Sequence, residues 1–236
     1  MITPNAAKAI NSKKIVLSKN TLPPSFTSGT KKENFNIYEQ LKRLIDGILA
    51  ILGLLFLAPF LAILAVLIKL ESPGPVLFAQ VRIGLCGSKF RCWKFRSMYI
   101  DAEERKRSLM TENEMQGGTT FKIKDDPRIT RVGRFIRKAS IDELPQLWNV
   151  LVGQMSLVGP RPPVPQEVEK YSAYDKQRLI VKPGITCIWQ VSGRSDIPFK
   201  DQVRLDVEYI RKRSLWMDLL LLLRTIPAVL LARGAY

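Results

Sequence analysis

Residues 48–68 read ILAILGLLFLAPFLAILAVLI, a run of 21 residues without a charged side chain. A straight helix of about 20 apolar residues is long enough to span the hydrocarbon core of a bilayer. Pro59 lies in the middle of the run, where it removes a backbone donor and disfavours helix at the preceding Ala58. Two topologies are therefore open. One is a transmembrane helix with a kink, and the other is a re-entrant helical hairpin that breaks near Pro59 and returns to the face it entered.

The charges that flank this run favour the re-entrant form. The residues before Ile48 hold eight Lys and Arg and three acidic residues, a net charge of +5, and the residues after Ile68 carry the rest of the total of +16. Because Lys and Arg collect in cytoplasmic segments, a single span would leave a basic flank outside the cell. We therefore expect a disordered tail over 1–33, a membrane-associated re-entrant hairpin over 34–70 and a cytoplasmic catalytic domain over 71–236.

The segment after the apolar run is typical of a compact α/β domain that is mostly helical. Short β-like runs occur at 76–78 and 90–95, and helical patterns dominate elsewhere. Residues 215–231 are apolar but are interrupted by two charged residues and a proline, which is too broken for a second span. They predict an amphipathic helix at the membrane interface, with Trp216 at the level of the headgroups. A helix packed on the core is the alternative.

Composition excludes several classes of enzyme. The chain has no histidine, so a Ser-His-Asp triad, a His-ligated zinc and an imidazole base are excluded. Its three cysteines are an odd number without C-x-x-C spacing, which argues against a disulfide framework and favours a reducing compartment. Any chemistry must then depend on carboxylates, Lys, Tyr, Ser or Cys.

Asp142 and Glu143 are the strongest candidates for catalysis. They follow Ser140, a residue type that caps helices, at the start of a helical apolar pattern over 141–151. Acidic residues in a first turn are also ordinary partners of the helix dipole. Adjacent helical positions point about 100° apart, so one acid could attack a phosphorus atom while the other holds a metal.

Basic residues beside Pro or Gly indicate a polyanionic substrate such as a diphosphate. Arg128, Arg161 and Arg194 lie in such loops, and Lys94 and Arg96 add to the group. The chain contains neither the P-loop pattern nor G-x-G-x-x-G. Because no recognition-helix module, RNP aromatic motif or zinc knuckle is present, we expect no nucleic-acid partner. We expect much of the positive charge to interact with anionic lipid headgroups.

Seven motifs occur in order along this domain: SPGPV at 72–76, KFRSM at 94–98, DDPRIT at 125–130, DELPQ at 142–146, MSLVGPRP at 155–162, KPGIT at 182–186 and WQVSGR at 189–194. As a set they resemble the bacterial sugar transferase family, the monotopic polyprenyl-phosphate phosphoglycosyl transferases. The resemblance covers roughly Leu41–Arg233.

The resemblance implies transfer of a hexose-1-phosphate from a UDP-sugar to polyprenyl (undecaprenyl) phosphate, with release of UMP. This reaction starts exopolysaccharide, O-antigen or capsule synthesis at the cytoplasmic face of the bacterial inner membrane. The resemblance also implies a covalent aspartyl-phosphosugar intermediate on Asp142 and Mg²⁺ bound by Glu143. The substrate-binding residues that it implies are Lys94, Arg96, Arg137, Arg161, Arg194 and Asp206.

Some features depart from the family or stay open. Ala58 stands where some members have Ser, and Cys187 stands where Gly is usual. Larger members carry further transmembrane helices and a soluble domain before this region, so we expect the catalytic unit alone. Homo-oligomerisation stays open. The rival functions are direct attack by the lipid phosphate without a covalent intermediate, and a non-catalytic basic membrane scaffold of a polysaccharide assembly complex.

Overall fold

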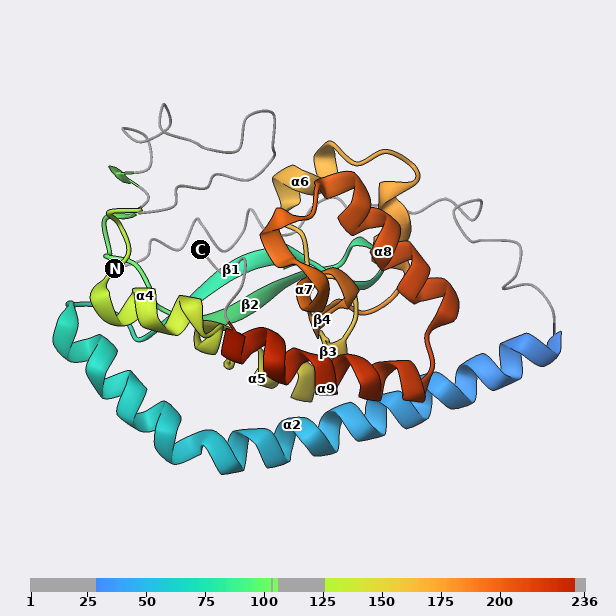
Figure 1. Cartoon of the computed structure of the whole chain (residues 1–236), viewed down its shortest axis with the longest axis horizontal. Coiled ribbons are helices and arrows are strands. Elements are labelled where there is room, and N and C mark those ends of the chain that lie inside the picture. Colours follow the sequence, from blue (N-terminus) through green and yellow to red (C-terminus); the bar gives the residue numbers. More distant parts are fainter. Residues whose placement is uncertain (1–28, 103, 106–125, 232–236) are drawn as a thin grey trace, which may run out of the picture.

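The computed structural model describes residues 29–102, 104, 105 and 126–231. This part of the chain is mostly helical, as predicted, and its strands form two small sheets, of which the β3–β4 pair was not predicted (Figure 1). Its elements, with η marking 3₁₀ helices, are in order α2 (Gly29–Glu71), β1 (Leu77–Ile83), η3 (Leu85–Gly87), β2 (Lys89–Phe95), α4 (Arg131–Lys138), η5 (Ile141–Glu143), α5 (Gln146–Leu151), β3 (Ser156–Val158), α6 (Pro165–Glu169), η6 (Asp175–Ile180), β4 (Gly184–Thr186), α7 (Ile188–Ser192), η7 (Arg194–Asp196), α8 (Phe199–Lys212) and α9 (Leu215–Leu231).

The apolar run lies in α2, a helix of 43 residues that continues through Pro59. Figure 1 shows that α2 bends, and that the other elements lie on the concave side of the bend. The expected break is therefore a bend within one continuous helix and does not separate two antiparallel arms. The helix also begins at Gly29, earlier than the predicted boundary at residue 34. The rest of the predicted tail, 1–28, lies outside the described residues.

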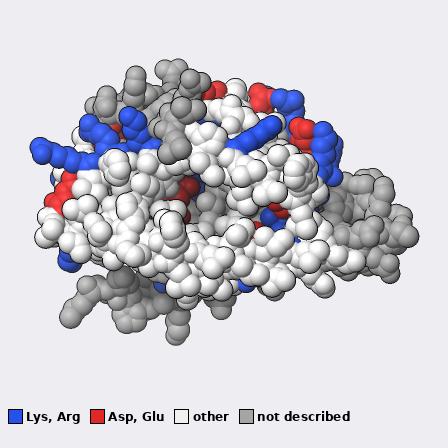
Figure 2. Space-filling model, turned by 60° about the horizontal axis from the view of Figure 1, so that its bottom comes forward, with Lys and Arg blue, Asp and Glu red and all other residues white. Residues whose placement is uncertain are grey.

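The outer face of α2 is apolar and exposed. By length and composition Ile37–Glu71 is sufficient to cross a membrane, and only 11% of its most apolar window is buried. Phe56 is 85% exposed and Leu55 69%, whereas Ala50 and Leu64 face the body and are buried. Figure 2 shows a broad surface without charged side chains, with most of the Lys and Arg gathered along one edge. Such a large exposed apolar face is typical of contact with a membrane or a protein.

The first arm of α2, which precedes Pro59, is held by a buried polar cluster that we call the α2–α9 cluster. The second arm follows Pro59. Lys42 Nζ lies 2.9 Å from Asp218 Oδ2 on α9, and the Tyr209 hydroxyl of α8 donates to Asp218 Oδ1 at 2.7 Å. The Ser156 hydroxyl of β3 donates to Asp46 Oδ2 at 2.7 Å. Both acids are buried and paired, so the cluster satisfies their charges inside the fold.

The second arm of α2 is held by two other contacts. The Glu71 carboxylate accepts hydrogen bonds from the backbone N–H groups of Arg131 (2.6 Å) and Val132 (3.0 Å), which caps the N-terminus of α4. Ile68 packs against Phe95 and Ile136 in a small apolar core. A carboxylate at a helix N-terminus satisfies free donors and complements the helix dipole. Both arms of α2 are therefore fastened to the same body.

The two sheets position loops that carry several of the seven sequence motifs. β1 and β2 form an antiparallel pair, and β3 and β4 form a short parallel pair. Gly159 follows β3 and lies so close to Gly184 that a Cβ atom on either residue would collide with backbone atoms of the other strand. The Gly159 N–H donates to the Thr186 carbonyl, and the Gly184 N–H donates to the Pro160 carbonyl. The GPRP and KPGIT motifs thus lie side by side and fix the backbone before Arg161.

Two details of the helical prediction need correction. The single helix expected over 141–151 is two pieces, η5 and α5, separated at Pro145. Proline cannot donate to the preceding turn, which explains the interruption. Trp148, one of the apolar residues of that pattern, is 53% exposed. The bounds of α9 do match the predicted amphipathic segment, and Trp216 is 67% exposed.

Candidate active site

The two adjacent carboxylates lie on η5, directly after α4. Ser140 adopts a left-handed conformation with φ of 54°, and it turns the chain from α4 into η5. Its side chain makes no capping hydrogen bond, so the predicted N-cap is wrong in its chemistry, although both acids do occupy the first turn. Asp142 is buried and Glu143 is half-buried, so the pair does not lie on a fully solvated surface of the protein.

Lys94 joins the two acids from β2. Its Nζ forms an ion pair with Glu143 Oε1 and lies 3.8 Å from Asp142 Oδ2. One ammonium group therefore serves two carboxylates.

The environment gives the two carboxyl groups different pKa values. Burial raises the pKa of Asp142 to about 6, and the charge of Glu143 adds to this, while Lys94 and Arg137 oppose it. Burial also acts to raise the pKa of Glu143, but the charge and hydrogen bond of Lys94, with Arg161 as a further cation, hold it below its usual value. Near neutral pH Glu143 is firmly ionised, and Asp142 is a more basic carboxylate than an exposed Asp.

A small cleft opens in front of Glu143 and Lys94. The side chains and backbone that line it come from β1, β2, η5, α5, the loop after β3, β4 and α7: Arg82, Cys92, Lys94, Glu143, Gln146, Arg161, Pro162, Gly184, Ile185 and Gln190. Three of these residues are cations, and only one is an acid. The cleft is therefore suited to an anion that can compete for Lys94 and the two guanidinium groups.

Arg82 and Arg161 have different roles in this cleft. Arg82 is buried and fixed, because its guanidinium donates to the Pro162 carbonyl at 2.9 Å and to Gln80 Oε1 at 2.6 Å. Burial and the nearby charge of Arg161 lower the pKa of Arg82 to about 10. Arg161 is half-buried and has no hydrogen-bond or ion-pair partner within the described parts of the chain. It is available to bind a phosphate oxygen.

Of the other predicted site residues, two lie at the edge of this group. Arg137 is on α4, and its charge lowers the pKa of Asp142. Arg194 is held with φ of 54°, and its guanidinium donates to the Ala228 carbonyl of α9 at 2.8 Å. Burial lowers the pKa of Arg194, and the charge of Glu143 opposes this. The structure brings Asp142, Glu143, Lys94 and Arg161 together, with Arg137 and Arg194 beside them.

Arg96 and Asp206 lie elsewhere. The Arg96 guanidinium donates to the carbonyls of Ile68, Ser72 and Pro73, so it closes the C-terminal end of α2. Asp206 is fully buried on α8, 2.7 Å from Arg178 Nη2, and burial raises its pKa to about 6. Neither residue lines the cleft.

Among the cleft-lining residues that were not predicted, three have charged or amide side chains: Arg82, Gln146 and Gln190. Gln146 and Gln190 lie inside the DELPQ and WQVSGR motifs, so the motifs themselves were the available signal. Arg82 lies in β1, outside every motif, and nothing in its local sequence distinguishes it from other arginines. It reaches the cleft because β1 pairs with the strand that carries Lys94.

Asp142 and Glu143 are the carboxylates of this site that could hold a divalent cation. No group of three or more His, Cys, Asp and Glu side chains occurs among the residues that the structure describes. Mg²⁺ is commonly held by one or two carboxylates together with phosphate oxygens of the substrate. The adjacent Asp142 and Glu143 fit this arrangement, in which phosphate oxygens of the substrate would complete the coordination of the metal.

Comparison with known proteins identifies the family of the chain. The sequence model of the family described as "Bacterial sugar transferase" matches residues 37–232. The chain is 51% identical over 195 residues to the galactosyl transferase CpsE of Streptococcus agalactiae, which covers 82% of this chain and 43% of that protein. It is 43% identical over 199 residues to the undecaprenyl-phosphate galactose phosphotransferase of Salmonella typhimurium, covering 83% of this chain and 42% of that protein.

A relative of similar length is the exopolysaccharide production protein ExoY of Sinorhizobium fredii, 41% identical over 198 residues, which covers 83% of this chain and 88% of that protein. The chain thus spans less than half the length of the CpsE and Salmonella relatives. The match of the family model to most of the chain leads to one conclusion. The chain belongs to the bacterial sugar transferase family.

Proposed function

We propose that the chain transfers a hexose-1-phosphate from a UDP-sugar to polyprenyl phosphate and releases UMP, as an early step in making exopolysaccharide or capsule. The observation that carries this proposal is the buried Asp142, which lies beside Glu143 and 3.8 Å from Lys94 Nζ, while Glu143 and Lys94 line a cleft together with Arg82 and Arg161. A diphosphate is the anion that three such cations would bind. The names of the relatives, which mention undecaprenyl phosphate, galactose and exopolysaccharide, support the same reaction.

The first half-reaction uses the Asp142 carboxylate as nucleophile. It attacks the phosphorus atom that carries the sugar, and the bond from that phosphorus to the bridging oxygen breaks with its electron pair on UMP. The product is an acyl phosphate between Asp142 and the sugar-phosphate. Its bond is comparable in reactivity to the diphosphate bond that was broken, so the group can be passed on.

In the second half-reaction the phosphate of the lipid attacks the same phosphorus atom. The Asp142 carboxylate leaves, and the products are a polyprenyl diphosphate sugar and free enzyme. No proton has to be removed from an ionised phosphate monoester, so the reaction needs no imidazole base. The absence of histidine from the chain is compatible with this mechanism.

The other residues of the cleft bind and orient the substrate. Arg161 and the fixed Arg82 would hold phosphate oxygens, and Lys94 would move its contact from Glu143 to the diphosphate. Glu143, with the substrate, would hold Mg²⁺, which when bound offsets charge on the diphosphate and on the departing UMP. Lys94 keeps the two carboxylates together when no substrate is present.

For the membrane, we propose the re-entrant topology at the cytoplasmic face of the inner membrane. Both arms of α2 contact the same body, through the α2–α9 cluster and through Glu71. Each apolar arm of the bent helix has about ten residues and reaches roughly 15 Å. That is half of the hydrocarbon core of about 30 Å, so the bend at Pro59 would lie near the middle of the bilayer.

Replacing the nucleophile tests the reaction. Asp142→Asn keeps the shape of the side chain but cannot form the acyl phosphate, so UMP release should fall by at least about a thousandfold, as for removal of other covalent nucleophiles. The assay is UMP release in detergent micelles with polyprenyl phosphate and a panel of UDP-sugars, including UDP-galactose and UDP-glucose. The control is Asp201→Asn, which changes a half-exposed acid on α8 that pairs with Arg204 at the surface. Turnover near the wild-type rate in Asp142→Asn would contradict the assignment, and no turnover of any UDP-sugar by the wild type would favour the scaffold.

Trapping separates the covalent mechanism from direct attack. Incubation with a UDP-sugar labelled in the sugar, without acceptor, should leave one label per active molecule on the wild-type protein and release an equal amount of UMP. Asp142→Asn should acquire none. A wild type that turns over with acceptor but never acquires label would indicate direct attack by the lipid phosphate.

A further inference from the structure

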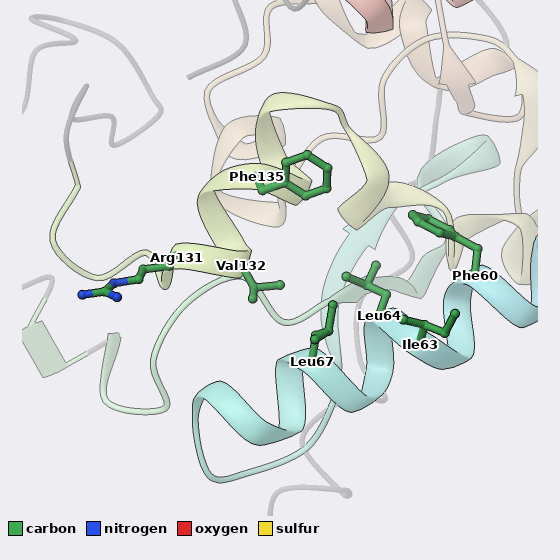
Figure 3. A pocket seen from close by; sticks show the side chains of 7 residues that line it. All are labelled: Phe60, Ile63, Leu64, Leu67, Arg131, Val132 and Phe135. Atoms are coloured by element: carbon green, nitrogen blue, oxygen red, sulfur yellow. The ribbon is translucent and has the colours of Figure 1, made fainter.

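A second cavity lies between the second arm of α2 and α4, away from the acidic pair. It is an open groove of about 340 Å³, lined by Phe60, Ile63, Leu64 and Leu67 of α2 and by Arg131, Val132 and Phe135 of α4. Figure 3 shows the apolar side chains of the two helices facing one another, while the Arg131 guanidinium points out of the groove. This groove therefore has essentially no polar wall.

The groove is continuous with the surface of α2 that faces the bilayer in the proposed topology. Ile63 is 63% exposed and Phe135 63%, so both line the groove and remain accessible from outside. Its volume is at the lower end of the roughly 300–1,000 Å³ of small-molecule sites. An opening of this size and composition accommodates a short stretch of hydrocarbon chain, and it would exclude a polar headgroup.

The groove is also connected to the nucleophile. Val132 and Phe135 of its wall belong to α4, and α4 leads through Ser140 directly into η5 with Asp142. On the inner side of the same helix, Ile136 packs with Leu64 in a buried cluster against which Ile141 also packs. A chain held in the groove would thus lie against the helix that presents the nucleophile, and Arg137 marks the end of that helix near Asp142.

From these observations we infer that the groove between α2 and α4 binds the isoprenoid chain of the lipid phosphate acceptor next to its phosphate end. This inference rests on the proposed function, because it assigns the second substrate of that reaction. The groove would hold the first isoprene units and direct the phosphate toward Arg137 and Asp142. An acyl chain of a bulk phospholipid has similar apolar chemistry, but its contact would be unrelated to the chemistry at Asp142.

Ile63→Trp tests the inference, because the larger ring would fill the groove from an exposed position and need not disturb the core. The matched control is Val66→Trp, which adds the same ring to an exposed residue of the same arm that does not line the groove. With undecaprenyl phosphate in mixed micelles, KM for the acceptor should rise about tenfold in Ile63→Trp, the effect of losing two or so buried methylene groups. Val66→Trp should have the wild-type KM.

Two further readouts make the outcome specific. The wild type should favour undecaprenyl phosphate over a two-isoprene phosphate, and Ile63→Trp should lose most of that preference. A photoactivatable diazirine analogue of leucine at position 63, which has about the size of Ile and leaves the groove open, should cross-link to polyprenyl phosphate, and excess polyprenyl phosphate, but not phosphatidylglycerol, should displace a labelled acceptor. An unchanged acceptor KM and chain preference in Ile63→Trp, or cross-linking only to phosphatidylglycerol, would overturn the inference.

These results are distinguishable from failure of the proposed function. Labelling of the protein by the UDP-sugar without acceptor depends on Asp142 and not on the groove. If the wild type acquires label but Ile63→Trp has a normal acceptor KM, only the groove assignment is wrong. If the wild type acquires no label and shows no turnover, the reaction itself is wrong.

Discussion

Asp142 should determine how the first half-reaction depends on pH. Burial raises its pKa to about 6, and only the ionised carboxylate can attack phosphorus. The reactive fraction therefore increases as the pH rises through 6, and the rate constant for the UMP burst should increase about tenfold between pH 5 and pH 7. The burst is measured by rapid quench without acceptor, so that titration of the lipid phosphate does not contribute.

Asp206 provides the control for this profile, because its pKa is also raised to about 6 while it lies in the core with Arg178. Asp206→Asn should keep the inflection near pH 6, and the surface variant Asp201→Asn should keep it too. A burst rate that is constant from pH 5 to pH 7, or an inflection that disappears in Asp206→Asn, would contradict the role of Asp142.

At the scale of single residues, the sequence identified the acid pair and most of its cations but could not assign each cation a place. Lys94 and Arg96 are two positions apart and look equivalent in the KFRSM motif. The difference arises because β2 ends at Phe95, so Lys94 points at the carboxylates while Arg96 lies beyond the strand, against α2. Arg82 was missed because its contribution depends on strand pairing and not on its neighbours in the chain.

At the scale of elements, Arg96 should contribute to stability more than to substrate binding. Arg96→Ala removes hydrogen bonds to three carbonyls at the end of α2, and bonds from a charged donor contribute about 1.5–3 kcal/mol each. With losses partly offset by water, we expect Tm in detergent micelles to fall by roughly 5–10 °C. Arg91→Ala, at an exposed position of β2, is the control and should have the wild-type Tm.

The opposite pattern would contradict this role. If Arg96→Ala kept the wild-type Tm but raised KM for the UDP-sugar, Arg96 would bind substrate as the family resemblance implies. Gly74 supports the structural role: it has φ of 115°, and a Cβ atom there would collide with the Arg96 guanidinium. The SPGP motif therefore makes room for this contact at the end of the apolar helix.

Among the elements, the sequence was informative where a long pattern defines a helix. The apolar run and the bounds of α9 were predicted because composition extends over many residues. The short pieces η5 and α5 were merged, because the apolar spacing continues across Pro145 while the hydrogen bonding does not. The polar residues inside α9 were treated as interruptions, yet Asp218 is the centre of the cluster that holds α2.

At the scale of the whole molecule, the topology can be measured by labelling. Gln40→Cys lies before the apolar run and Lys200→Cys lies on α8; both positions are exposed, and both would be introduced into a Cys86→Ser background, since the other two cysteines are buried. An impermeant maleimide should label both positions in inverted membrane vesicles and neither position in intact cells. Labelling of the two positions from opposite sides would indicate a spanning helix.

The double attachment of α2 also has a consequence for how the protein reaches its membrane. In the re-entrant topology the segments that flank the apolar helix both stay on the cytoplasmic side, where the chain is synthesised. No hydrophilic segment therefore has to cross the bilayer. Insertion would then require neither an export channel nor a membrane potential. The folded body could bind to the membrane surface and insert the bent helix into one leaflet, with both ends of the helix still attached to the body.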